Sequence, residues 1–188
     1  MDKITIALDG RLQQVGDTIN HTCHLDLETY DLTERTFSLP SGMDVDVVLT
    51  NAGEGILCTG IVRAEVVGTC DRCLDEARFE VAGEVDEYFL FEEPSEDDAA
   101  ELEEEGLDYS VVGADSTIDL TDAICSAFVM EIPYVVLCQE DCKGLCPVCG
   151  ENLNHVDCGH AQEQLLLEEQ RRIENSPFAV LKQLNLNE

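Results

Sequence analysis

Apolar residues alternate with polar or charged residues over most of the stretch from residue 44 to residue 91. The run DVDVVLTN places Val45, Val47 and Leu49 on one face. The run GILCTGIVRAEVVGT gathers five residues on one side, namely Ile56, Cys58, Val62, Ala64 and Val66. The run EARFEVAGEVDEYFLF turns four residues inward, namely Phe79, Val81, Val85 and Phe89, and four outward, namely Arg78, Glu80, Glu84 and Asp86. A period of two is typical of half-buried strands, so the three runs predict an antiparallel meander with one solvated face.

Shorter signals surround this meander. The residues NAGEG at 51–55 are typical of a hairpin turn, and CDRCL at 70–74 lies between the second and third strands. Residues 4–8, ITIAL, predict a further short strand. Residues 9–38 have only weak periodicity, and no element is assigned to them. Within them, HTCH at 21–24 has no second ligand pair beside it and is interpreted as two surface histidines on a strand or loop.

A helical period replaces the alternation after residue 117. Four apolar residues fall on one helical stripe, namely Leu120, Ile124, Ala127 and Phe128. Asp119 or Thr121 is the expected N-cap, and Pro133 ends the helix at about Glu131. Farther along, AQEQLLLEEQRRIEN predicts a polar helix, and SPFAVLKQL predicts a last helix that begins at Ser176-Pro177.

These patterns predict an α+β fold with two parts. The first, residues 1–137, is an antiparallel β-meander or partly closed barrel with a few helices. The second, residues 138–188, is a small cysteine-rich zinc-knuckle module with C-terminal helices. Residues 92–108 hold ten acidic and no basic residues, which predicts a disordered insertion in the first part. This insertion is either a solvated spacer or an arm that captures a basic partner.

The charge of the chain restricts the class of its partners. Its 41 acidic and 10 basic residues give a net charge of −31. Such a surface repels nucleic-acid phosphates, because binding to phosphates depends on Lys and Arg. A basic protein is therefore the favoured partner, and the alternative is that the charge only confers solubility.

The sequence lacks the patterns of a membrane span and of a signal peptide, and this indicates the cellular compartment. No apolar run approaches the roughly 20 residues that a membrane span needs, and MDKITIALDG has no signal-peptide pattern. We therefore expect a cytoplasmic protein with no membrane partner. Because thiols stay reduced in that compartment, a cluster of cysteines favours a metal site over disulfides.

Such a cluster lies at residues 138–160, CQEDCKGLCPVCGENLNHVDCGH. It offers six candidate ligands, namely Cys138, Cys142, Cys146, Cys149, Cys158 and His160. The segment Cys146-Pro-Val-Cys149-Gly is the central pair, because thiolates at this spacing can face one metal ion. The two remaining ligands are left open: Cys138 with Cys142, Cys158 with His160, or the distant pair Cys70 and Cys73. Zinc is favoured over an iron–sulfur cluster, since the spacings differ from those of ferredoxins.

No motif indicates catalysis. The sequence contains no H-x-E, H-E-x-x-H, G-x-x-x-x-G-K-[ST] or G-x-S-x-G. A site rich in sulfur ligands also leaves zinc neutralised and closed. We therefore predict a structural zinc site in a protein that is not an enzyme, with no catalytic residues and no small-molecule substrate.

Four segments together resemble the YceD-like family, whose members are described as large ribosomal RNA subunit accumulation proteins. They are CDRCL at 70–74, IDLTDAICSAFVMEIPYVVLC at 118–138, CKGLCPVCGENLN at 142–154 and SPFAVLKQL at 176–184. The resemblance covers about residues 44–184. It implies a soluble bacterial protein needed for the synthesis, processing or stability of 23S ribosomal RNA, with no established enzymatic activity. The family gene often lies beside that of a small basic ribosomal protein.

The resemblance also carries over cysteine positions. The family's C-x-R-C-L pair corresponds to Cys70 and Cys73, and its C-terminal cluster corresponds to four further cysteines, namely Cys142, Cys146, Cys149 and Cys158. Many members end that cluster with C-x-C, where this chain has Cys158-Gly-His160. Some members keep the first pair without the second cluster, which favours a zinc site local to the C-terminal module.

Three hypotheses about function follow. The first is a ribosome-biogenesis factor that contacts basic large-subunit ribosomal or assembly proteins, with only indirect contact to the RNA. The second is direct binding of precursor RNA by the zinc module. Its segment 138–160 has Lys143 as the one basic residue, and Arg171 and Arg172 follow on the helix. The third is a regulator that responds to thiol oxidation or zinc.

Overall fold

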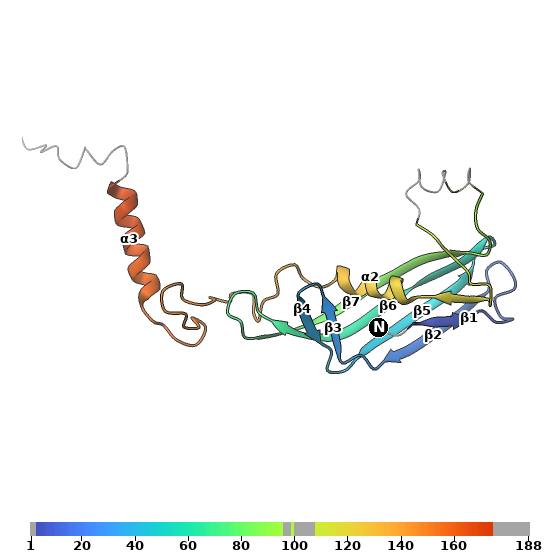
Figure 1. The fold of residues 1–188 in the computed structure, drawn as a ribbon, viewed down its shortest axis with the longest axis horizontal. Coiled ribbons are helices and arrows are strands. Elements are labelled where there is room, and N and C mark those ends of the chain that lie inside the picture. The colour runs from blue at the N-terminus through green and yellow to red at the C-terminus, as the bar shows by residue number, and fades with distance from the viewer. Residues whose placement is uncertain (1–2, 96–98, 100–107, 175–188) are drawn as a thin grey trace, which may run out of the picture. The chain divides into compact units, whose positions relative to one another are not determined.

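The computed structural model describes residues 3–95, 99 and 108–174, which form mostly antiparallel β-sheet with few helices (Figure 1). The strands are β1 (Thr5–Ala7), β2 (Thr18–Leu25), β3 (Thr29–Leu32), β4 (Arg35–Ser38), β5 (Met43–Asn51), β6 (Gly55–Thr69), β7 (Glu76–Leu90), β8 (Ser110–Val111) and β9 (Thr117–Asp119). The helices are α2 (Thr121–Met130) and α3 (His160–Glu174). The predicted last helix and most of the predicted acidic insertion, residues 96–98 and 100–107, lie outside the described residues.

The chain divides into two compact units. The first contains residues 1–69 and 76–136, and the second contains residues 70–75 and 137–188. The division expected from the sequence, between 137 and 138, lies next to the observed one. What the sequence did not indicate is that the turn between β6 and β7 belongs to the second unit.

The sheet of the first unit is built around β6. This strand pairs with β7 along its whole length, from Gly55↔Leu90 to Thr69↔Glu76. Its other edge is shared by β5 and, near Val67, by β4. Strand β2 extends the sheet beyond β5, and β3 extends it beyond β4. No closed barrel forms among the described strands, so the meander, the first of the two predicted alternatives, describes this sheet.

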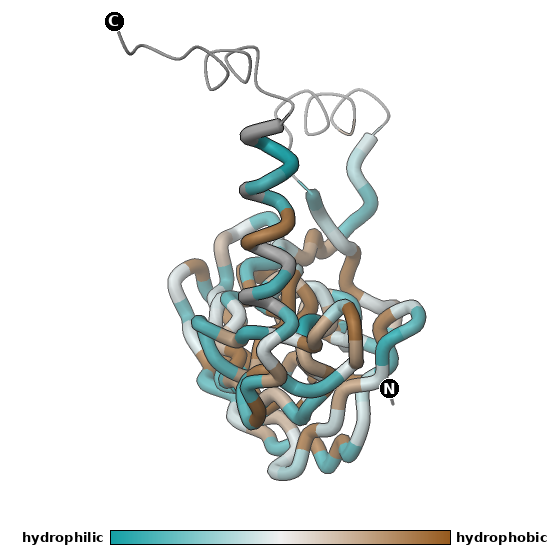
Figure 2. The backbone as a smooth tube through the Cα atoms, turned by 90° about the vertical axis from the view of Figure 1, so that its left-hand side faces the viewer, coloured by the Kyte–Doolittle hydropathy of each residue, from teal (hydrophilic) through white to brown (hydrophobic). Residues whose placement is uncertain are grey.

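One face of the sheet carries the core. The predicted inward positions of β5 and β6 are all buried, and Val81, Val85 and Phe89 are buried on β7, while Phe79 is half-buried. The predicted outward residues of β7, Arg78, Glu80, Glu84 and Asp86, are exposed. Figure 2 shows brown and teal segments interspersed along the backbone of the sheet, and teal segments with a brown stretch along α3. No helix in the described part of the chain is long and apolar enough to cross a membrane.

Helix α2 covers the core face of β6 and β7 (Figure 1). Ile124, Ala127 and Phe128 are buried, as the helical stripe predicted, and the ring of Phe128 meets that of Tyr30 edge to face with centroids 5.0 Å apart. Leu120 occupies the N-cap position, where its side chain makes no capping hydrogen bond. Asp119 acts one residue earlier, since its Oδ1 accepts the backbone N–H of Thr121 at 3.0 Å.

Candidate metal centres

The second unit brings eight potential ligands into two clusters. The first cluster consists of Cys70, Cys73, Cys138 and Cys142, and the second cluster consists of Cys146, Cys149, Cys158 and His160. Within each cluster, every ligand atom lies within 4.8 Å of the others. These are the only such groups of cysteine, histidine and carboxylate side chains in the part of the chain that the structure describes.

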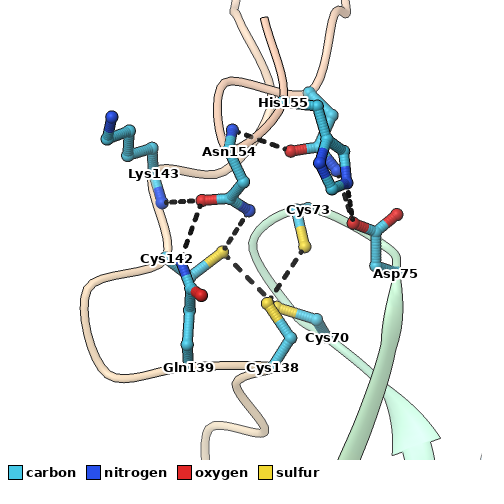
Figure 3. Close-up of polar contacts among 10 residues, drawn as sticks. Cys70, Cys73, Asp75, Cys138, Gln139, Cys142, Lys143, Asn154 and His155 are labelled. Carbon is cyan, nitrogen blue, oxygen red and sulfur yellow. Dashed lines mark hydrogen bonds and ion pairs between the residues drawn. The ribbon is translucent and has the colours of Figure 1, made fainter.

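The four sulfur atoms of the first cluster point toward one another (Figure 3). The Sγ atoms of Cys70 and Cys142 are 3.8 Å apart, and those of Cys73 and Cys138 are 3.5 Å apart. A tetrahedral zinc ion with Zn–S bonds of about 2.3 Å requires sulfur atoms about 3.8 Å from one another. Three of the four residues are buried and Cys138 is half-buried, so the first cluster fits a closed metal site.

Amide N–H groups favour thiolate formation at two positions of the first cluster. At Cys70, burial is the largest influence and opposes ionisation, but the N–H groups of Cys73, Arg72 and Cys138 together outweigh it and lower the pKa to about 6. At Cys142, the side-chain amide of Asn154 is the main cause of a lowered pKa. Burial raises the pKa of Cys73, and it raises that of Cys138 to about 12. Binding of a metal cation would have to displace the protons that these two thiols hold.

Asn154 links the first cluster to the loop around it. Its Nδ2 donates to the Sγ of Cys142 at 3.2 Å, and its Oδ1 accepts the backbone N–H of Lys143 at 2.8 Å (Figure 3). Arg72 adds a second tie, because its guanidinium donates to the carbonyl oxygen of Cys142 at 3.0 Å. Hydrogen bonds of this kind orient metal ligands and tune their basicity.

We expect Asn154→Ala to weaken metal binding at the first cluster by roughly 10- to 100-fold, because the Cys142 thiolate loses its side-chain donor. Competition with a chromophoric zinc chelator would measure this change. Gln139→Ala is the matched control, since Gln139 contacts Asn154 only through its side-chain amide at 3.4 Å. Equal affinities for the Asn154→Ala variant and the unmodified chain would contradict this role of Asn154.

The two Cys-x-x-Cys segments adopt the same turn. In the first, the N–H of Cys70 bonds to the carbonyl of Asp75 and the N–H of Leu74 to that of Cys70. In the second, the N–H of Cys146 bonds to the carbonyl of Glu151, and that of Gly150 to the carbonyl of Cys146. In both, the amides two and three residues after the first cysteine lower its pKa. CDRCL and CPVCG are therefore two copies of one knuckle.

The two knuckles differ in the residue after the second cysteine. Gly150 has φ +76°, which glycine adopts without strain, but Leu74 has φ +64°. We expect Leu74→Gly to change the free energy of unfolding by about 1 kcal/mol in the stabilising direction, because an L-residue pays for a left-handed conformation and the Leu74 side chain is 65% exposed. Chemical denaturation would measure it. Leu74→Ala serves as the control, which keeps the positive φ, and an equal gain there would contradict the explanation.

The second cluster combines the CPVCG knuckle with the start of α3. His160 is the first residue of that helix, and its Nδ1 lies 3.9 Å from the Sγ of Cys146. The backbone N–H groups of Cys149 and Val148 lower the pKa of Cys146 to about 6. At Cys158 the N–H of His160 lowers the pKa, but the Cys146 side chain and burial together outweigh it and raise the pKa. Cys149 is exposed, so this cluster is more open than the first.

The sequence-derived candidates are all present in the two clusters, but their grouping differs from what the spacing suggested. The sequence analysis assumed one metal site with four ligands, so at least two of the six candidates between residues 138 and 160 had no role. The structure places all six in one or the other of the two clusters. The distant pair, Cys70 and Cys73, lies with Cys138 and Cys142 and not with the CPVCG knuckle. HTCH lies on β2 and joins no cluster, with His24 Nδ1 2.7 Å from Asp44. Asn154 was missed, and no spacing rule could have identified it.

The described residues thus define an antiparallel β-sheet protein with a cysteine-rich module in which two Cys/His clusters could each bind a metal ion. Over residues 58–185 the chain matches the family described as "Large ribosomal RNA subunit accumulation protein YceD". The chain therefore belongs to the YceD family, as the resemblance of its four segments indicated.

Similar proteins occur in mycobacteria. An uncharacterized protein of Mycobacterium bovis and one of Mycobacterium tuberculosis are each 34% identical over 156 residues, which is 83% of this chain and 70% of the relative. An uncharacterized protein of Mycobacterium leprae is 31% identical over 123 residues, which is 65% of this chain and 54% of the relative. No solved structure matches the chain.

Proposed function

We propose that this protein supports the accumulation of large-subunit 23S ribosomal RNA as a ribosome-biogenesis factor. The observation that carries the proposal is the family match, because the family is described by this role and the match covers residues 58–185. The match includes both cysteine clusters, the meander strand β7 and helix α2. The protein acts in the cytoplasm, where reduced thiols remain available to a metal ion.

Zinc is the proposed ion in both clusters, and its role is structural. Four cysteines, or three cysteines and one histidine, are ligand sets that zinc prefers in closed tetrahedral sites. Bound zinc would cross-link loops that are distant in sequence, such as residues 70–75 and 138–142, and so hold the second unit in one shape. A complete set of four protein ligands leaves no open position for a substrate, which favours a protein that is not an enzyme.

The proposed partner is a basic ribosomal or assembly protein of the large subunit. The net charge of −31 favours a cationic surface over an RNA backbone. Among the described residues of the second unit, the basic side chains are few, namely Arg72, Lys143, Arg171 and Arg172. An acidic protein can shield a basic ribosomal protein before that protein meets RNA, and such shielding would protect the assembling subunit.

Affinity purification from cell lysate tests the proposal. At low salt, the tagged full-length protein should enrich large-subunit ribosomal proteins, and the recovery should fall as salt rises, because salt screens contacts between exposed charges. A tagged acidic protein of similar net charge and unrelated fold is the control for nonspecific capture. Recovery of no large-subunit component above that control would contradict the proposed function.

A further inference from the structure

Most of one edge of strand β7 has no strand partner among the residues that the structure describes. It is paired with β6 along its whole length on one side, but on the other side only Phe89 and Leu90 pair, with β8. Within the described part of the chain, no strand adjoins the stretch Glu76–Tyr88 on that edge. In an antiparallel strand, alternate residues direct their N–H and C=O groups away from the existing partner. This stretch, called here the β7 edge, is therefore a template for an added strand.

The side chains along the β7 edge are sorted by face. On the solvated face, four acidic residues are exposed, namely Glu76, Glu80, Glu84 and Asp86. The one cation among them, Arg78, is held by its neighbours, since its Nε is 2.8 Å from Glu76 and its Nη1 is 3.2 Å from Glu65. On the opposite face, Ala77, Val81 and Val85 are buried. The β7 edge thus presents negative charge on its solvated face, while the side chains of its other face are packed into the core.

A second copy of this chain is a poor occupant of the β7 edge. Residues that face each other in an antiparallel pair lie on the same face of the sheet. In β7 the solvated face consists of the even-numbered residues, four of which are acidic, so an antiparallel pair of β7 strands sets this face against itself. Its one cation, Arg78, is already held by Glu76 and Glu65. Like charges directly opposite each other are destabilising. A strand with basic residues at alternate positions instead faces acidic side chains at four positions, namely Glu76, Glu80, Glu84 and Asp86.

We propose that the β7 edge is the docking site for an extended basic segment of a partner protein, which adds to the sheet as a strand next to β7. Backbone hydrogen bonds hold the segment, and its Lys or Arg residues at every second position lie beside Glu80, Glu84 and Asp86. That the partner is a basic protein rests on the proposed function. The β7 edge adds the place where this partner binds and the extended conformation of the segment that binds.

A synthetic peptide tests the mode of binding. The probe is a fluorescent peptide in which Lys alternates with Thr or Val, and fluorescence anisotropy with the full-length protein measures its affinity. Two counterparts carry N-methyl groups, one on every Lys and the other on every Thr and Val. A strand added at the edge of a sheet donates hydrogen bonds to that edge from the backbone N–H groups of every second residue only. One methylated counterpart should therefore bind at least about tenfold more weakly than the parent peptide, and the other should bind nearly as well as the parent. Equal binding of both, or no binding of the parent peptide, would overturn the proposal.

Charge reversal tests the location. The triple variant Glu80→Lys, Glu84→Lys, Asp86→Lys should bind the parent peptide about tenfold more weakly, because three cross-strand charge pairs are lost. The control Glu28→Lys, Glu34→Lys, Glu54→Lys changes the net charge equally at exposed residues outside β7 and should lower affinity much less. Equal losses in both variants would show that net charge attracts the peptide, which would overturn the assignment to the β7 edge.

The same variants separate this proposal from the proposed function. If the unmodified chain recovers large-subunit proteins from lysate and the β7 variant recovers them equally, the proposed function stands and the β7 edge is not the docking site. If the unmodified chain recovers none, the proposed function fails, and the methylated peptides still report whether the edge accepts a strand. Circular dichroism of each variant verifies that the sheet remains folded.

Discussion

Replacing Cys70 by Ser is expected to reduce the zinc content of the purified protein from two ions per chain to one. Cys70 is fully buried in the first cluster, 3.8 Å from the Sγ of Cys142, and serine does not supply a thiolate. Structural zinc contributes about 10–16 kcal/mol of apparent binding free energy in small zinc domains, so the loops of the first cluster should lose their order. Native mass spectrometry measures the stoichiometry, and proteolysis after residue 137 reports the loss of order.

Two further variants make this result specific. Cys149→Ser should also leave one ion, but in the first cluster, because Cys149 belongs to the second cluster. The combination of both substitutions should bind none. Cys125→Ser is the control for the loss of a thiol, since Cys125 lies on α2 and outside both clusters. A content of two zinc ions in Cys70→Ser would contradict the assignment of ligands.

Replacing Gly83 by Val is expected to destabilise the first unit by about 3 kcal/mol. A Cβ atom at this position would clash with the carbonyl oxygen of Ala127, because the backbone of α2 lies directly against β7 there. Backbone cannot rotate away as a side chain can, so the helix must lift from the sheet and expose Phe128. Urea denaturation followed by circular dichroism gives the change in the free energy of unfolding.

The matched control is Ala82→Val, one residue away on the same strand. Ala82 is exposed on the solvated face, where valine suits a strand and meets no helix. We expect its unfolding free energy to stay within about 0.5 kcal/mol of the unmodified value. Similar losses in both variants would show that β7 tolerates no larger residue on either face, which would remove the close approach of α2 as the cause.

The sequence predicted the strands and the helix in which one face is apolar and the other is polar or charged. Strands β5, β6 and β7 alternate between valine or isoleucine and charged residues, and both hairpin turns and the helix α2 were predicted at the observed places. Strand β2 gave no such signal, because its half-buried side comprises Ile19, His21, Cys23 and Leu25 and its exposed side is also polar. A strand at the rim of a sheet buries less of itself than a central strand, so its sequence has less contrast.

The candidate site was predicted residue by residue but not as an arrangement. Spacing identifies ligands that share one turn, such as Cys146 with Cys149, because the geometry of that turn is local. It cannot indicate that Cys73 lies 3.5 Å from Cys138, since these residues are 65 positions apart and their contact depends on the path of the chain between them. The number of candidates was the available signal: six local groups and one distant pair supply eight ligands, enough for two tetrahedral sites.

The most direct test of the function is nuclease treatment of the complexes recovered with the full-length protein. If the protein acts through basic proteins, large-subunit ribosomal proteins should remain bound after the RNA has been digested. Crosslinks to RNA should be absent at Lys143, Arg171 and Arg172, three basic residues of the cysteine-rich unit. Release of all ribosomal proteins by nuclease, together with large-subunit RNA crosslinked at these three residues, would contradict the account.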